Sequence, residues 1–163
     1  MTDEAMRAKK WLNRSYDLYR RLNSDRKLLE VIEARLNPAV ASYKVRDNET
    51  DSETARKNHE AIQDEYTIQK KLVEAEETVL TFEDDKTKRK IDLLPEPHRS
   101  IATRRYLNRL KWSEIAIVEN YSEQHCKRLN KEMLQLMAEI LRKGTNFEEA
   151  TNDESSSEGN KWN

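Results

Sequence analysis

The chain has 163 residues and a formal net charge of −1, with 37% charged and only 36% hydrophobic residues. This composition excludes a large single apolar core and is typical of elongated helices with narrow apolar stripes and much solvated surface. Its two glycines, Gly144 and Gly159, leave residues 1–143 without a glycine turn, so we expect an all-α protein.

Charge is unevenly distributed along the chain. Residues 1–94 carry 19 basic and 20 acidic side chains, residues 95–143 carry 10 and 6, and residues 144–163 carry 1 and 5. The excess of +4 in residues 95–143 favours a polyanionic partner for that segment.

Several classes of protein and site are not expected. No apolar run approaches the roughly 20 residues that span a bilayer, and the first residues lack the apolar segment of a signal peptide, so we predict a cytoplasmic protein without membrane contact. Cys126 is the single cysteine, and His59, His98 and His125 are too scattered for a metal spacing. Because no paired acid/base residues and no phosphate-binding glycine loop occur, we expect no metal, no cofactor and no enzyme.

The first predicted element is a helix over residues 3–36. Ser15 and Asp25 interrupt an apolar stripe with alternating steps of three and four, and the residue before Pro38 ends the helix. The stripe consists of Ala8, Trp11, Leu18, Leu22, Leu29, Ile32 and Leu36. Residues 39–48 have no helical period and are predicted to form a loop.

A second long helix is predicted to begin at the capping box of Thr50 and Glu53. Its apolar stripe consists of Ala61, Ile68, Leu72, Ala75, Val79 and Phe82, and the stripe is widened by Ile62, Tyr66, Val73 and Leu80. The two long helices can pair with each other as a hairpin or pair across a homodimer as a coiled coil. The sequence leaves both arrangements open, and Pro95 and Pro97 mark the break before the next element.

Residues 95–143 are predicted to form three helices. The first spans residues 97–109 and the second spans residues 112–119, with Trp112, Ile115, Ala116 and Val118 turned inward. Asn120 suits the left-handed backbone of a tight turn, and Ser122 is the expected N-cap of the third helix. Steps of 100° then place Cys126, Leu129 and Met133 on the inner side of that helix.

The outer side of the third helix carries hydrogen-bond donors, as a helix that reads the major groove of DNA requires. We predict base contacts from Gln124, Lys127 and Arg128. Phosphate contacts are predicted from Arg104, Arg105, Arg109, Lys111 and Lys131.

These features resemble the helix-turn-helix of the fourth region of bacterial sigma factors, and more closely the ArpU/RinA-like phage transcription regulators. The resemblance is carried by Arg105-Tyr106, by Trp112-Ser-Glu-Ile-Ala116 and by Tyr121-Ser122, in that order, and it extends over residues 8–142. It implies a phage or prophage regulator, an activator of late genes, that binds double-stranded DNA in a bacterial host and also contacts host RNA polymerase.

The expected organisation is therefore a long helical hairpin or dimerisation coiled coil over residues 1–94, a helix-turn-helix module over residues 95–143 and a disordered acidic tail over residues 144–163. Two other functions remain open at this point. One is a helical interaction or scaffolding protein that does not bind DNA, and the other is a small-terminase-like subunit for phage DNA packaging.

Overall fold

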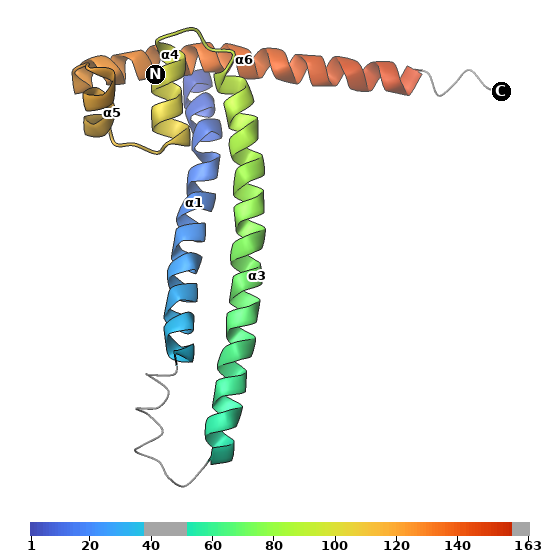
Figure 1. Ribbon diagram of the computed structural model, residues 1–163. Helices are drawn as coiled ribbons and strands as arrows, with labels where there is room; N and C mark the ends of the chain where they lie inside the picture. Colours follow the sequence, from blue (N-terminus) through green and yellow to red (C-terminus); the bar gives the residue numbers. More distant parts are fainter. Residues whose placement is uncertain (38–51, 158–163) are drawn as a thin grey trace, which may run out of the picture. The chain divides into compact units, whose positions relative to one another are not determined.

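The computed structural model describes the backbone of residues 1–37 and 52–157 and the side chains of residues 1–37 and 52–144 (Figure 1). Its elements in chain order are α1 (Asp3–Leu36), α3 (Ser52–Ile91), α4 (His98–Ala102), the π-helical turn η1 (Thr103–Leu107), α5 (Trp112–Glu119) and α6 (Glu123–Ser157). The described backbone contains no strand, which confirms the all-α class with two long helices at its amino-terminal end. None of these described helices combines the length and apolar character of a membrane span.

The predicted loop over residues 39–48 and the threonine of the predicted capping box lie outside the described residues. The predicted bounds of α1 and α5 are confirmed. The helix predicted over residues 97–109 is shorter, since it runs from His98 to Leu107, and it changes from an α-helix to a π-helical turn at Thr103. In that turn the amide of Asn108 donates to the carbonyl of Thr103 at 2.9 Å, a bond to the fifth residue back.

The predicted end of the third helix is also wrong, because α6 continues past Gly144 to Ser157. A single glycine inside a helix costs only about 1 kcal/mol relative to alanine, and the sequence that follows it contains the strong helix formers Glu148, Glu149 and Ala150. The prediction of a disordered tail therefore does not describe the backbone of residues 144–157, and residues 158–163 lie outside the described chain.

The chain forms two compact units. One consists of Asp17–Phe82, and the other joins Met1–Tyr16 to Glu83–Asn163. This division differs from the predicted boundary between residues 94 and 95. The reason is that the first turns of α1 and the last turns of α3 supply apolar side chains to the core of the carboxyl-terminal module. Of the side chains that the long helices supply, Ala8 and Trp11 belonged to a predicted stripe, whereas Leu12, Ile91 and Leu94 did not.

The unit that contains the carboxyl-terminal module has two apolar clusters. In the larger cluster, Leu12 of α1 and Ile91 of α3 pack with Tyr106 of η1 and with Met133 and Met137 of α6. The smaller cluster joins Ile101 of α4, Ile115 of α5, and Cys126 and Leu129 of α6. Each fully buried aliphatic side chain stabilises the fold by roughly 1.5–3 kcal/mol, so these clusters fix α4, α5 and α6 against one another.

The other unit is an antiparallel helical hairpin formed by the rest of α1 and α3. Arg26 pairs with Glu77 at 2.9 Å, and Arg35 pairs with Glu65 at 3.9 Å, so the residue numbers rise along α1 as they fall along α3. The predicted stripe of α1 lies in this contact, with Leu22 and Ile32 fully buried. Of the two arrangements left open by the sequence, the structure therefore contains the pairing within one chain.

The stripe predicted for α3 does not face α1. Ile68, Leu72, Val79 and Phe82 are exposed, whereas Val73 is buried. The residues that were expected only to widen the apolar face are the ones that pack, because the hairpin turns that side of α3 toward α1. The side-chain amide of Gln69 completes the contact by donating to the backbone carbonyl of Asp25 at 3.0 Å.

Candidate nucleic-acid interface

The candidate site is built by α5, the turn that follows it and the first turns of α6. The amino-terminal end of α5 is fixed by Glu114, whose carboxylate accepts a hydrogen bond from the backbone amide of Lys111 at 2.7 Å. Lys111 itself has an extended backbone, as an N-cap residue does, and its side chain is exposed. The start of α5 therefore combines an anchored backbone with a cation in solvent.

Asn120 ends α5 in the left-handed conformation predicted from the sequence, with φ 57° and ψ 43°. This conformation lets the amide of Tyr121 donate to the carbonyl of Ala116 at 3.0 Å, which satisfies one of the free carbonyls at the end of the helix. The chain reverses within two residues and enters α6.

The start of α6 is capped as predicted. The Ser122 hydroxyl accepts a hydrogen bond from the amide of His125 at 3.1 Å, and the Ser122 carbonyl accepts one from the amide of Cys126 at 3.0 Å. The ring of His125 packs edge-on against Tyr121, with centroids 4.7 Å apart. These contacts fix the orientation of the first turn of α6, where the predicted base contacts begin.

The inner side of α6 carries the predicted residues. Cys126, Leu129 and Met133 are buried, and burial raises the pKa of the Cys126 thiol, which keeps it protonated and unreactive near neutral pH. On α5, Ile115 is buried and Trp112 and Ala116 are half-buried against the same cluster. The predicted burial of Val118 is wrong, because it is exposed at the end of α5, together with Ile117.

The outer side of α6 presents the three predicted base-contacting residues to solvent. Gln124, Lys127 and Arg128 are exposed, and Lys131 follows on the same side one turn later. Arg128 is held in place, since its guanidinium lies 2.6 Å from Nδ1 of His125. Within the described side chains, no hydrogen bond or ion pair occupies Gln124, Lys127 or Lys131, so their donors face water.

Two acidic residues, Glu123 and Glu132, are exposed near this cationic side of α6. Glu132 contacts His98 of α4, with the carboxylate oxygen 2.9 Å from Nε2. The outer side is therefore not uniformly positive. Its basic residues occupy a strip along α6, and a polyanion would have to align with that strip.

The predicted phosphate-contacting residues fall into two groups. Lys111 and Lys131 are exposed, as a phosphate contact requires. Arg104 and Arg105 are half-buried and already engaged within the unit. Arg104 pairs with Glu119 at 3.1 Å, while Arg105 lies over the ring of Trp112 at 4.7 Å and donates to the carbonyl of Leu110.

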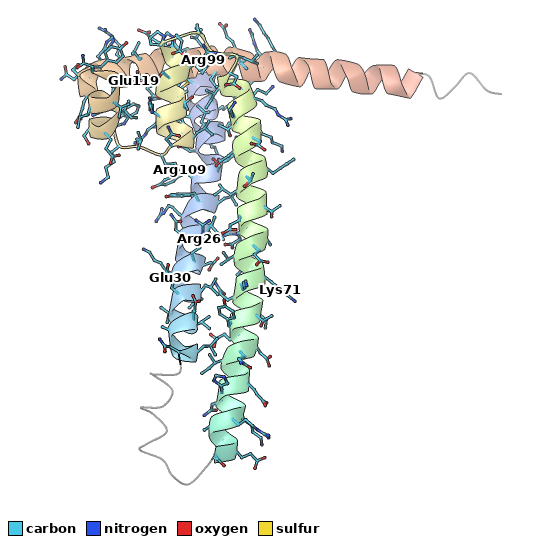
Figure 2. All side chains as sticks on the ribbon, in the orientation of Figure 1. Arg26, Glu30, Lys71, Arg99, Arg109 and Glu119 are labelled. Carbon is cyan, nitrogen blue, oxygen red and sulfur yellow. The ribbon has the colours of Figure 1, made fainter. Side chains whose placement is uncertain are left out.

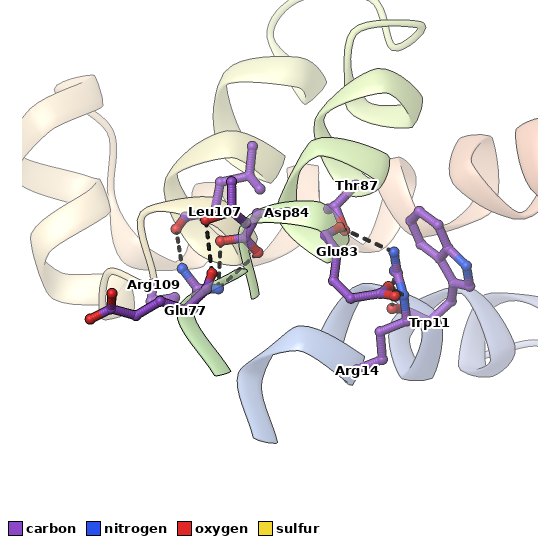
Figure 3. Close-up of polar contacts among 9 residues, drawn as sticks. Trp11, Arg14, Glu77, Glu83, Asp84, Thr87, Leu107 and Arg109 are labelled. Atoms are coloured by element: carbon purple, nitrogen blue, oxygen red, sulfur yellow. Dashed lines mark hydrogen bonds and ion pairs between the residues drawn. The ribbon is translucent and has the colours of Figure 1, made fainter. Parts of the chain in front are cut away.

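The expectation that Arg109 is available at the surface is wrong. Its side chain is only 12% exposed, and its Nη2 atom donates to both carboxylate oxygens of Asp84 at 2.9 and 3.0 Å (Figure 3). Its Nη1 atom donates to the carbonyl of Leu107 at 2.8 Å. The backbone of Arg109 is left-handed, with φ 57°, which turns the side chain back toward α3. Arg109 therefore closes the turn after η1, with its guanidinium held between Leu107 and Asp84.

A second arginine with the same kind of structural role is Arg14. Its Nε atom pairs with Glu83 at 2.8 Å, its Nη1 atom donates to the carbonyl of Trp11, and its guanidinium lies over the Trp11 ring (Figure 3). Like Arg109, Arg14 forms an ion pair with an acidic residue of α3 within the same unit. Neither ion pair could be predicted from the sequence, because Arg14 lies 69 residues from Glu83 and Arg109 lies 25 residues from Asp84.

Glu119 is the residue of this region that sequence reasoning missed. Its carboxylate accepts hydrogen bonds from the Ser100 hydroxyl at 2.6 Å and from Arg104 at 3.1 Å. The Ser100 hydrogen bond, and then Arg104, hold the pKa of this carboxyl below its usual value. Glu119 thus ties the end of α5 to α4 and η1, which fixes the angle at which the chain enters α6.

Among the described residues, no group of three or more histidine, cysteine, aspartate or glutamate side chains could hold a metal ion. Comparison with known proteins gives no assignment, because no family model, no curated protein and no solved structure matches this chain.

Proposed function

We propose that this chain is a transcriptional regulator that binds double-stranded DNA, with α5, the turn at Asn120 and α6 acting as a helix-turn-helix. The observation that carries the proposal is the partition of α6. Its inner side is buried in the module, whereas Gln124, Lys127 and Arg128 extend into solvent from the first turns of a capped helix. The major groove of B-form DNA accepts one such helix, and these three side chains can donate to base edges.

In this proposal each exposed residue has its own task. Arg128 and Lys127 donate to guanine O6 and N7, and Gln124 pairs with adenine N6 and N7. Lys111 and Lys131 neutralise phosphates at either end of the strip and fix the register of α6 in the groove. Arg104 and Arg105 belong to the support of the module, because their guanidinium groups are engaged with Glu119 and Trp112.

The wider biological role rests on the resemblance to phage regulators. We propose a phage-encoded or prophage-encoded activator of late genes that works in the cytoplasm of a bacterial host and contacts host RNA polymerase. The DNA module comes last in this chain, whereas in small terminase subunits it usually comes first, so a packaging role is the weaker alternative.

A second candidate function is a helical interaction or scaffolding protein. The observation that favours it is the exposed apolar stripe of α3, which is a surface for another protein and not for a polyanion. The two functions differ in one measurable respect, since only the first depends on the charge of α6.

The test begins with selection of bound sites from random duplex DNA by the full chain at two salt concentrations. We expect an enriched motif and a steep loss of affinity with added salt, because each neutralised phosphate releases counterions. The double change Lys127→Glu and Arg128→Glu should abolish enrichment. A matched control is Lys9→Glu with Lys10→Glu, which makes the same charge change at exposed positions of α1. If the two double variants bind duplex DNA equally well, α6 is not the recognition helix.

A further inference from the structure

Arg128 differs from the other exposed donors on the outer side of α6, because its guanidinium contacts another side chain. Its Nη2 atom lies 2.6 Å from Nδ1 of His125, three residues earlier on the same side of the helix. The pair lies in the first turns of α6, shortly after Glu119, the last residue of α5, which is labelled in Figure 2. The contact therefore orients a charged donor at the place where the proposed recognition helix begins.

The chemistry of the two groups assigns the protonation of His125. A guanidinium has five N–H donors and no acceptor, so the nitrogen that it contacts must accept the hydrogen bond. Nδ1 of His125 accepts only when the imidazole is neutral and carries its proton on Nε2. A proton on Nδ1 would face an N–H group of Arg128 and would break the contact.

Two further contacts fix the imidazole itself. The backbone amide of His125 donates to the Ser122 hydroxyl at 3.1 Å, which anchors this residue in the capped first turn of α6. Its half-buried ring meets the ring of Tyr121 edge-on, with centroids 4.7 Å apart and an interplanar angle of 85°. The acceptor for Arg128 is therefore carried by a ring that is supported from both the backbone and the preceding turn.

The hydrogen bond to His125 leaves Arg128 able to read a base. It uses one of the two N–H groups of Nη2, so four donors remain and one two-pronged edge of the guanidinium stays complete. Such an edge matches O6 and N7 of guanine, the commonest specific contact in the major groove. Ordering an arginine on binding costs rotamer entropy, and a guanidinium that is already oriented loses less of it.

We propose that His125 is a positioning residue for base readout, an inference that rests on the proposed DNA-binding function. Its neutral imidazole orients Arg128 toward O6 and N7 of a guanine in the bound site. Lys127 has no hydrogen bond or ion pair within the described side chains, and its ammonium is a point charge on a flexible stem. Arg128 therefore discriminates between bases more strongly than Lys127 does.

The first test uses the free full chain and does not depend on DNA. Nitrogen-15 NMR at pH 8, where free imidazole is neutral, distinguishes the two tautomers, and the His125 signals are assigned by their loss in His125→Phe. We expect the proton on Nε2 and an unprotonated Nδ1. We also expect the order parameter of the Arg128 side chain, from carbon-13 relaxation at Cδ, to fall in His125→Phe. A proton on Nδ1, or an unchanged order parameter, would overturn the proposal.

The second test is a double-mutant cycle with two probes, the site recovered by selection and a random-sequence duplex of the same length. His125→Phe keeps an uncharged ring but removes the acceptor. We expect it to weaken binding to the selected site about threefold to tenfold and binding to the random duplex by less than about twofold. In an Arg128→Ala background the same change should have no further effect.

Rescue and control variants complete the cycle. His125→Asn should bring binding of the selected site back to within about twofold of the wild type, because its Oδ1 atom takes the place of Nδ1 as acceptor. The matched control is His59→Phe, the same change at an exposed position of α3, which should leave both affinities unchanged. Thermal unfolding checks the fold of each variant, and His125→Leu replaces His125→Phe if that variant unfolds.

The outcomes separate the positioning role from DNA binding itself. If the wild type binds neither probe, both the proposed function and the role of His125 fail. If the wild type binds the selected site and His125→Phe binds it equally well, only the role of His125 fails. Equal losses on both probes, or a loss that persists in the Arg128→Ala background, would assign His125 to the stability of the module and would also overturn the proposal.

Discussion

Arg109 donates from one nitrogen, Nη2, to both carboxylate oxygens of Asp84, although 25 residues separate them in the sequence. The pair joins the turn after η1 to the last part of α3 within one compact unit. An arginine that sequence reasoning assigned to DNA is thereby assigned by the structure to the stability of the module that presents α6.

Removing this pair should destabilise the fold without acting directly on DNA. We expect Arg109→Ala to lower the free energy of unfolding in urea by about 1–3 kcal/mol, since it leaves the half-buried Asp84 carboxylate without a cation. Lys111→Ala is the control, because that exposed side chain should change stability by less than about 0.5 kcal/mol while weakening DNA binding. An Arg109→Ala protein as stable as the wild type but defective in DNA binding would return Arg109 to the interface.

The turn between α5 and α6 should prefer glycine. Asn120 has φ 57°, a region that is strained for most residues but open to glycine, so Asn120→Gly should raise the free energy of unfolding by a few tenths of a kcal/mol and Asn120→Ala should lower it by about 1 kcal/mol. Asn108 is the matched control. Its φ is −80°, so Asn108→Gly should destabilise the protein. Thermal unfolding of the three variants measures the difference, and the same sign at both asparagines would contradict the left-handed turn.

The hydrogen bonds to Glu119 make part of the stability depend on pH. Its pKa is lowered in the folded state, first by the Ser100 hydroxyl and then by Arg104, from an ordinary value of 4.5. A carboxyl group whose pKa is lower in the folded than in the unfolded protein stabilises the fold at pH values above its unfolded-state pKa. That stability is lost as the pH falls below 4.5 and through the lower pKa of the folded state. Glu119→Gln should therefore be less stable than the wild type at pH 7 and equally stable at low pH. Unfolding in urea at several pH values tests this, and a difference that does not change with pH would exclude Glu119 as its source.

Gly144 provides a test of the continuous α6. A Cβ atom placed there would lie 2.7 Å from Nζ of Lys90, which is the movable end of a flexible side chain. Inside a helix, Gly144→Ala should raise stability by roughly 0.5–1 kcal/mol and increase the helical signal in circular dichroism. If the helix ended at Gly144 in a left-handed cap, the same change would lower stability, and that result would contradict the continuous helix.

How far the candidate site could be predicted is seen from single residues. Asn120 and Ser122 act locally, one through its own backbone and the other on an amide three residues away, so their roles could be read from the sequence. Glu119 and Arg109 act on Ser100, Arg104 and Asp84, and no local pattern connects those positions. The outward direction of Lys127 and Arg128 was predictable because the apolar side of α6 is unmistakable in its spacing.

The sequence by itself determined the all-α class, the bounds of α1 and α5, and which residues of each helix share a side, because a period of 3.6 residues and the capping residues act within a single helix. Only the tertiary structure decided which of these sides is covered. On α3 it buried Val73 and left Ile68 in solvent, since the contact with α1 is set by the summed burial and ion pairing of two helices. The tertiary structure also placed the start of α1 and the end of α3 in the same compact unit as the carboxyl-terminal module, because that small core needs apolar side chains that its own residues do not supply.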